Sequence, residues 1–216
     1  MITNTGKYIK KTIIYYTSPT TIEKGLLDTY KPQTMESVNY KNWISILDLR
    51  TCMKCRSMHG KIYSKDEIPD VEQQLHPNCR CEIKPMESIF AGGATKDGDA
   101  GADFWLQYFG KLPDYYVTES EAHANGWKKG KSPAKFIPGK MITMGIYNNL
   151  NEHLPQANGR IWYEADINYY EGKRNGHRVL WSNDGLIFVT YDHYKTFYEI
   201  IGEDYGIQEN RYFRFN

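Results

Sequence analysis

Four side chains suited to acid–base chemistry lie close together in the second half of the sequence. The stretch WYEADINYYEGKRNGHR begins at Trp162 and contains Glu164, Arg174 and Arg178. The segment YDHY follows it and contains His193. A positioned carboxylate and imidazole serve as general base and general acid, and planar guanidinium groups bind phosphate oxygens. The pattern predicts chemistry at a phosphate, against the alternative of charges on a solvated face.

These residue types suit the cleavage of RNA through a 2′,3′-cyclic phosphate. That reaction needs a base on one side of phosphorus, an acid on the other, and fixed positive charge for the equatorial oxygens. It requires no metal, and the sequence after residue 98 carries no dedicated metal-binding cluster. We therefore expect no cofactor for catalysis.

The elements that must position these groups follow two periodicities. Helical spacing comes first, at 103–110, 118–127 and 132–139, and Thr118 with Glu121 forms a capping box. Strand-like apolar runs with short turns between them follow, at 141–147, 161–169, 178–183, 186–192 and 196–201. The predicted fold class is α+β, with N-terminal helices packed on an antiparallel sheet of about five strands, preceded by a small cysteine-containing domain.

Period two also predicts which side chains of 161–169 share a face. Ala165 and Ile167 then point into a core against the helices, while Glu164 stands on the open face. Asp166 shares that open face, where we expect it to brace an arginine.

A linker divides the chain. The stretch SIFAGGATKDGDAGADF is rich in Gly, Ala and Asp, which favours a flexible connection. We predict a cysteine-containing segment at 1–87, a linker at 88–100 and a nuclease domain at 101–216.

All four cysteines precede the linker. TCMKC contains Cys52 and Cys55, and HPNCRC contains Cys79 and Cys81. Cys55 and Cys79 are separated by 23 residues. Four thiolates at such spacings hold a structural zinc ion, and His59 or His76 could replace one of them. Two disulfides, or four reduced buried thiols, are the alternatives.

The charge distribution limits the classes of partner. The whole chain carries +1, and residues 98–216 carry 13 Lys and Arg against 15 Asp and Glu, a net charge of −2. The nuclease half is therefore not a nucleic-acid binder by bulk charge. No apolar run spans a membrane, and the run TIIYY is too short for a signal-peptide core. We expect synthesis in the cytoplasm, followed by virion packaging or export by a route other than Sec.

The second half resembles the barnase-like, guanyl-preferring bacterial ribonucleases. The similarity covers residues 102–200 and rests on YFGKLPDYYVTESEAHANGW, PGKMITMGIYNN and GRIWYEADINYYEGKRNGHRVLWSNDGLIFVTYDHYKTF. It implies that Glu164 is the general base, that His193 is the general acid and that Arg174 and Arg178 hold the scissile phosphate. It further implies that Tyr194 binds substrate and that Asn149 belongs to the loop that reads guanine.

Three positions depart from that family's pattern. Glu119 stands where the family has a lysine that faces the phosphate. Leu150 and Asn151 replace an arginine and a glutamate in the guanine loop. The first departure predicts a slow enzyme, and the other two predict a weaker preference for guanine.

Residues 40–86 resemble the C-terminal signature of phage Mu F-like head-morphogenesis, or minor capsid, proteins. The similarity rests on NWISILDLRTCMKCRSMHGKIY and HPNCRCEIKP. It implies a prophage origin and an attachment or delivery role, with a phage head or a secretion apparatus as a partner. Because a ribonuclease made in the cytoplasm endangers its host, we also expect a small acidic, barstar-like inhibitor protein.

The sequence thus predicts a toxin-like endoribonuclease behind a phage-derived segment. The alternative is a non-enzymatic phage head or virion protein that carries a degraded nuclease fold. The four retained chemical groups favour the enzyme, while Glu119 favours the alternative.

Overall fold

A computed structural model describes residues 32–67, 78–169, 171 and 174–202. His76 lies outside these residues, so its suggested part in a zinc site is not described. Among the helices that are described, none has both the length and the apolar character needed to cross a membrane.

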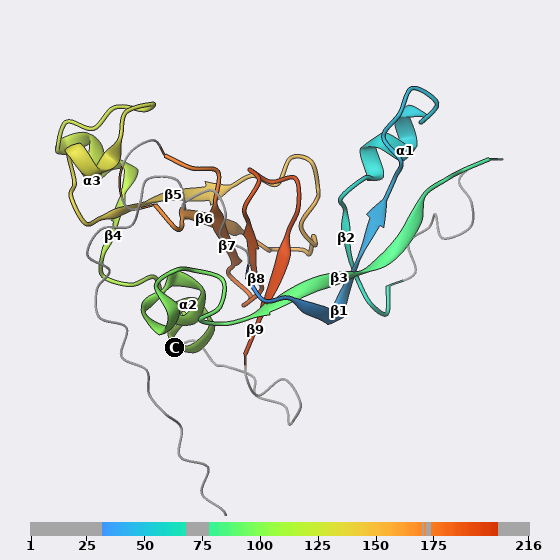
Figure 1. The fold of residues 1–216 in the computed structure, drawn as a ribbon, viewed down its shortest axis with the longest axis horizontal. Helices are drawn as coiled ribbons and strands as arrows, with labels where there is room; N and C mark the ends of the chain where they lie inside the picture. The colour runs from blue at the N-terminus through green and yellow to red at the C-terminus, as the bar shows by residue number, and fades with distance from the viewer. Residues whose placement is uncertain (1–31, 68–77, 170, 172–173, 203–216) are drawn as a thin grey trace, which may run out of the picture. The chain divides into compact units, whose positions relative to one another are not determined.

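One mixed sheet dominates the described residues (Figure 1). Its order is β2-β1-β3-β9-β8-β7-β6-β5-β4. The strands are β1 (Met35–Ile44), β2 (Ile62–Ser64), β3 (Glu82–Phe90), β4 (Tyr116–Thr118), β5 (Met141–Tyr147), β6 (Trp162–Asp166), β7 (Arg178–Ser182), β8 (Ile187–Thr190) and β9 (Tyr198–Ile201). The pairs β3–β9 and β4–β5 are parallel, and the other neighbours are antiparallel.

Three α-helices occur within the described ranges. They are α1 (Met53–Met58), α2 (Ala102–Phe109) and α3 (Glu119–Ala124), and 3₁₀ turns lie at η2 (Gly98–Ala100) and η3 (Pro133–Lys135). The capping box of α3 forms as predicted, with Thr118 and Glu121 each bonding the backbone of the other. Gly110 ends α2 in the left-handed region, at φ 66°, where glycine carries no Cβ penalty.

The predicted fold class is wrong. The helical and strand segments expected after residue 101 are present, but they do not form helices on a separate five-stranded antiparallel sheet. Nine strands form one mixed sheet, because β3, which runs from the cysteine-containing segment into the predicted linker, pairs in parallel with β9 through Ile89 and Ile200. Local periodicity marks a strand but does not say which distant strand completes its hydrogen bonds.

Both faces of the central strands are covered. On one face, Ala102 and Leu106 of α2 pack against a cluster that includes Ala165, Val179 and Val189. The other face carries a second cluster, which consists of Ile62, Met86, Leu154, Trp162, Leu180, Phe188 and Phe197. Ile62 and Met86 come from the cysteine-containing segment, so that segment supplies part of the core beneath the nuclease sheet. The face predicted to be open is therefore closed around Trp162.

The segment predicted as a flexible linker is ordered by specific contacts. Ser88–Phe90 belong to β3. The buried Asp103 carboxylate accepts the N–H groups of Gly92 and Ala94, at 2.8 and 2.9 Å. The Lys96 amide donates to Asn168, at 2.8 Å. The Gly- and Asp-rich composition of this segment therefore reflects tight turns and caps. The positions of the domain boundaries stay a prediction.

Candidate active site

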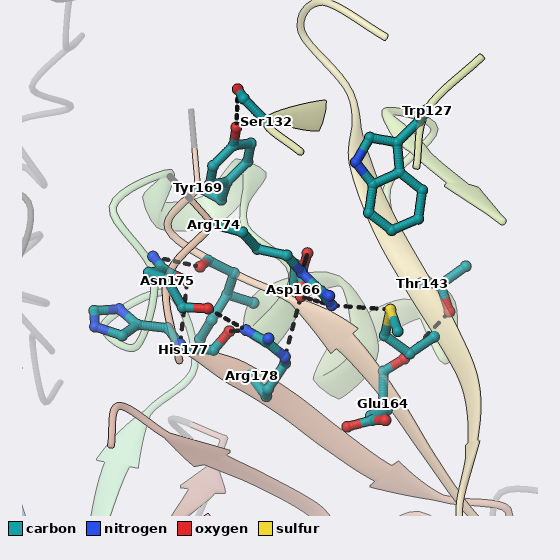
Figure 2. A network of polar contacts seen from close by, with 12 residues as sticks. Trp127, Ser132, Thr143, Glu164, Asp166, Tyr169, Arg174, Asn175, His177 and Arg178 are labelled. Carbon is teal, nitrogen blue, oxygen red and sulfur yellow. Dashed lines mark hydrogen bonds and ion pairs between the residues drawn. The ribbon is translucent and has the colours of Figure 1, made fainter. Parts of the chain in front are cut away.

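A buried carboxylate joins the two arginines singled out in the sequence. Asp166 and Arg178 lie directly opposite each other on β6 and β7, and Arg178 Nε approaches Asp166 Oδ1 to 3.1 Å, too poorly aligned for a hydrogen bond. Arg174 binds both oxygens of Asp166, from Nε and Nη2, each at 2.7 Å. Figure 2 shows both guanidinium groups converging on Asp166. Asp166 therefore braces two arginines, where the sequence suggested one.

Each guanidinium group has further supports. Arg178 donates from Nη1 to the carbonyls of Asn175 and His177, at 2.9 and 2.7 Å. Burial works to lower the pKa of Arg174, but the hydrogen bonds and charge of Asp166 raise it overall, so Arg174 remains charged. Arg178 is buried, whereas 19% of the Arg174 side chain is exposed. The pair thus forms a rigid cationic site with one accessible member.

Glu164 lies two residues before Asp166 and on the same face of β6. Its carboxylate is half-buried and accepts the Tyr194 hydroxyl at Oε2, at 2.5 Å. Opposite Glu164, β5 has a register irregularity between Thr143 and Gly145, where Gly145 adopts φ 80°. Such bulges redirect side chains beside active sites. At this irregularity the Met144 sulfur lies 2.9 Å from Arg174 Nη2.

His193 lies in the loop between β8 and β9. Its side chain is exposed, and its ring centroid is 4.7 Å from that of Tyr194. Both residues have positive φ, 60° and 69°, a region that non-glycine residues adopt mainly where the surroundings enforce it. Asp192 supplies that enforcement, because its Oδ1 accepts the backbone amides of Lys195 and Thr196, at 3.0 and 2.9 Å.

Tyr194 connects Glu164 to the loop that carries His193. Burial, and then the hydrogen bond to Glu164, raises the pKa of Tyr194, so the phenol stays protonated and can donate to that carboxylate. Its ring stacks on Tyr147 at 5.3 Å. Sequence reasoning missed Tyr147 and Asp192. Asp192 could have been found, because an aspartate at a turn often accepts the backbone amides of the residues that follow it. No sequence signal distinguished Tyr147 from the other tyrosines, of which the chain has 18 in all.

The Asn149 side chain points into the loop that follows β5 and holds it closed. The side chain is buried; its Nδ2 donates to the Leu154 carbonyl at 2.9 Å and its Oδ1 accepts the Leu154 amide at 3.1 Å. Asn149 itself has φ 43°. Both ends of its amide are thus committed to closing the loop. Leu150 is 87% exposed at the tip.

Glu119 is the first residue of α3. Its carboxylate lies 3.8 Å from His123 Nε2, one turn further along the helix. About a third of its side chain is exposed, at 32%. The structure thus gives Glu119 a helical partner and leaves it outside the Asp166 network of Figure 2.

The four cysteines gather at the start of α1 and before β3. Cys52 caps α1 by accepting the Cys55 amide at its sulfur, at 3.4 Å. The sulfur atoms of Cys55, Cys79 and Cys81 lie within 4.8 Å of one another. No disulfide joins the four cysteines among the described residues. Three clustered sulfurs with a fourth nearby fit a tetrahedral thiolate site.

The second half therefore presents a carboxylate, two anchored guanidinium groups and an imidazole loop joined by one tyrosine. This arrangement defines a site for acid–base chemistry at a phosphodiester. Residues 106–201 match the family model described as ribonuclease, and residues 2–84 match the one described as Phage Mu protein F like protein. The chain belongs to this ribonuclease family and carries a Mu F-like segment before the nuclease part. The Mu F-like match begins well before the predicted residue 40.

Named relatives support this assignment. The chain is similar to a ribonuclease of Heyndrickxia coagulans, with 47% identity over 103 residues, which are 47% of this chain and 94% of the relative. Ribonucleases of Bacillus intermedius and Bacillus pumilus show 47% identity over 103 residues too, and there the matched residues span 63% of each relative.

Asp166 should be essential for stability. We predict that Asp166→Asn lowers the free energy of unfolding by about 3 kcal/mol, because two cations lose the charge that offsets their desolvation. The matched control is Asp184→Asn, which breaks an Arg160 pair whose aspartate is 44% exposed and should cost about 1 kcal/mol or less. Urea unfolding of parent and both variants measures the difference. Equal losses for the two variants would show that Asp166 is an ordinary surface partner.

Proposed function

We propose that the nuclease half cleaves single-stranded RNA as a metal-independent endoribonuclease. The observation that carries this proposal is the shared face on which Glu164 stands beside two arginines fixed by Asp166. The ribonuclease family match supports the same class of reaction.

In the proposed reaction Glu164 removes the proton of the ribose 2′-hydroxyl, and the 2′-oxygen attacks phosphorus. The bond from phosphorus to the 5′-oxygen breaks, His193 protonates that oxygen, and a 2′,3′-cyclic phosphate remains. Arg174 and Arg178 neutralise the charge that grows on the equatorial oxygens. Water then opens the cyclic phosphate with the two proton-transfer roles exchanged.

The local geometry suits these roles. The Tyr194 hydroxyl donates to Glu164 Oε2, which fixes the orientation of the proposed base. Because Asp166 holds both arginines before substrate arrives, their charge needs little rearrangement in the transition state. The exposed His193 ring meets solvent, as a group that exchanges protons between the two steps requires.

Base selection is proposed to lie in the loop 149–154, with guanine preferred. The closure of that loop by Asn149 and Leu154 supports a preformed site for a base. Leu150 and Asn151 lack the charged groups of related loops, so we propose that backbone groups carry most of the recognition and that the preference is weak.

The Mu F-like match supports a phage-associated origin for the chain. We propose a toxin-like module that is synthesised in the cytoplasm and is packaged in a phage head or exported by a non-Sec route. The anchored arginines also suit capture by a small acidic, barstar-like inhibitor, since opposite charge speeds association.

A structural zinc ion is proposed at Cys52, Cys55, Cys79 and Cys81. The clustering of three sulfurs within 4.8 Å supports it. When bound, the metal would join α1 to the start of β3 and add folding free energy to the segment.

A second candidate is a non-enzymatic phage head protein with a degraded nuclease fold. The observation that favours it is Glu119, a negative charge at a position where related enzymes place a lysine. We rank it second because the base, the arginines and their aspartate brace are all retained.

The acid–base pair should be required for cleavage. We predict that Glu164→Gln and His193→Ala each reduce kcat/KM by about two to four decades, the usual effect of losing a general base or acid. Activity should follow a bell-shaped pH profile, falling where the carboxylate is protonated and where the imidazole is neutral. Steady-state cleavage of GpU in EDTA measures this, with Glu171→Gln and His123→Ala as exposed controls. Parent-like cleavage by Glu164→Gln would exclude it as the base.

Reversing the charge at residue 119 should accelerate the reaction. At roughly 5 Å and an effective dielectric of about 20, one pair of unit charges is about 3 kcal/mol, and exposure reduces that value. We predict that Glu119→Lys raises kcat/KM by at least about tenfold, with a smaller gain at high salt. Ser120→Lys, which adds the same charge to the next position of α3, is the control. An equal gain from both variants would indicate bulk attraction, and no gain would place the phosphate away from α3.

The cysteine cluster should bind zinc. Protein purified under reducing conditions should contain about one zinc ion per chain, which Cys79→Ser and Cys81→Ser should each lose. Chelator should lower the temperature of unfolding but not GpU cleavage measured below that temperature, because the proposed chemistry uses no metal. Ser57→Ala, an exposed change on α1, is the control. Zinc-free parent protein by elemental analysis would contradict the site.

A further inference from the structure

The short strand β2 makes contacts outside the cysteine-containing segment. It stands at the end of the sheet order and pairs with β1 through Ile62 and Asn42. The amide of Ile62 donates to the carbonyl of His153, at 2.9 Å. An edge strand offers unpaired backbone groups, and here the loop after β5 takes one of them.

Two further contacts hold the same loop. Lys61 Nζ lies 2.7 Å from Glu152 Oε2, and only 20% of the Lys61 side chain is exposed. The hydrogen bond from Lys61 lowers the pKa of Glu152, so the pair is charged at neutral pH. Gly60 has φ 85°, and a Cβ built there would lie 3.6 Å from the His153 ring. Lys61 and Ile62 therefore hold Glu152 and His153 through an ion pair and a backbone hydrogen bond, and a side chain at position 60 would meet the His153 ring.

His153 connects this loop to Phe197 and Tyr194. The imidazole of His153 packs against Phe197 with a centroid distance of 6.3 Å. Burial lowers the pKa of His153, and a hydrogen bond to the Tyr194 backbone partly opposes that change. Tyr194 in turn donates to Glu164. One side chain thus lies between the edge strand β2 and the residue that bonds the proposed base.

Packing fixes the inner side of the loop. Leu154 is fully buried in the cluster that contains Ile62 and Met86. Glu152 has φ 51° and Asn149 has φ 43°, so the loop holds two non-glycine residues in a sparsely populated conformation. Such a conformation persists only when surrounding contacts enforce it, and Lys61 and Ile62 supply two of those contacts.

We propose that Gly60, Lys61 and Ile62 of the Mu F-like segment are positioning residues of the nuclease site, which hold the loop 149–154 in the conformation that selects the base. The inference rests on the proposed ribonuclease function. It makes the phage-derived segment part of the substrate site and not only an attachment. Leu150 and Asn151 supply no charge for recognition, so the backbone position of this loop matters all the more.

A charge swap in the full chain tests the proposal. Lys61→Glu and Glu152→Lys should each lower the ratio of kcat/KM for GpU over ApU by about two- to fivefold, the scale of a partly exposed ion pair. Each should also speed hydrogen exchange of the Leu154 amide, which is bonded to Asn149. The double variant should restore both values, which a merely structural loss would not do. Glu82→Lys, with the same charge change in β3, is the control.

A backbone variant gives a second, independent measurement. Gly60→Val should produce a larger fall in the GpU to ApU ratio, since valine is strained at φ 85° and its methyl groups meet the His153 ring. Gly185→Val, at φ 96° with open space around it in the β7–β8 turn, carries the same strain away from the loop and should leave the ratio unchanged.

Different results would contradict the positioning role of residues 60–62 and the proposed ribonuclease function. Parent-like exchange at Leu154 in Lys61→Glu, Glu152→Lys and Gly60→Val would overturn the inference. A parent-like base ratio in an active enzyme would do the same. A parent chain that cleaves neither dinucleotide would instead overturn the proposed function, while the exchange of Leu154 would still decide whether residues 60–62 position the loop.

Discussion

Everything at the candidate site depends on one buried carboxylate. Asp166 lies between Arg174 and Arg178, and all three charges are largely removed from water. Desolvation makes such a cluster costly unless the geometry is good and the remaining donors are bonded. The β6–β7 register provides the geometry by placing Asp166 opposite Arg178, and the carbonyls of residues 175 and 177 accept further donors. The result is a buried cluster in which two guanidinium groups are held in place before any ligand binds.

The sheet can hold this cluster because both of its faces are packed. One face carries α2, and the other carries a cluster to which the cysteine-containing segment contributes Ile62 and Met86. The parallel pairing of β3 with β9 continues the sheet into that segment. The nuclease part and the cysteine-containing, Mu F-like part therefore share hydrogen bonds and core, and an exchange of either part would expose apolar surface of the other.

The departures from related ribonucleases fit this shared architecture. A nuclease that recognises its base through charged loop residues can stand alone. In this chain Leu150 and Asn151 offer no charge, while Lys61 and Ile62 hold the loop from a different part of the sequence. Residues 61 and 62 thus give this loop a support from outside the nuclease half. Glu119 likewise has a local partner, because its carboxylate lies near His123 within α3.

The sequence by itself determined the chemistry and the local elements. Glu164, Arg174, Arg178 and His193 were found from residue type and spacing, and the strands and the capping box of α3 followed from periodicity and cap chemistry, all of which act over a few residues. Only the tertiary structure decided the nine-stranded order, the packed linker and the contact of residues 60–62 with the loop 149–154. Those features join residues 90 or more positions apart in several cases, as Lys61 and Glu152 do. Pairing between distant segments depends on which edges and apolar faces remain unsatisfied once local structure has formed, and no local pattern encodes that choice.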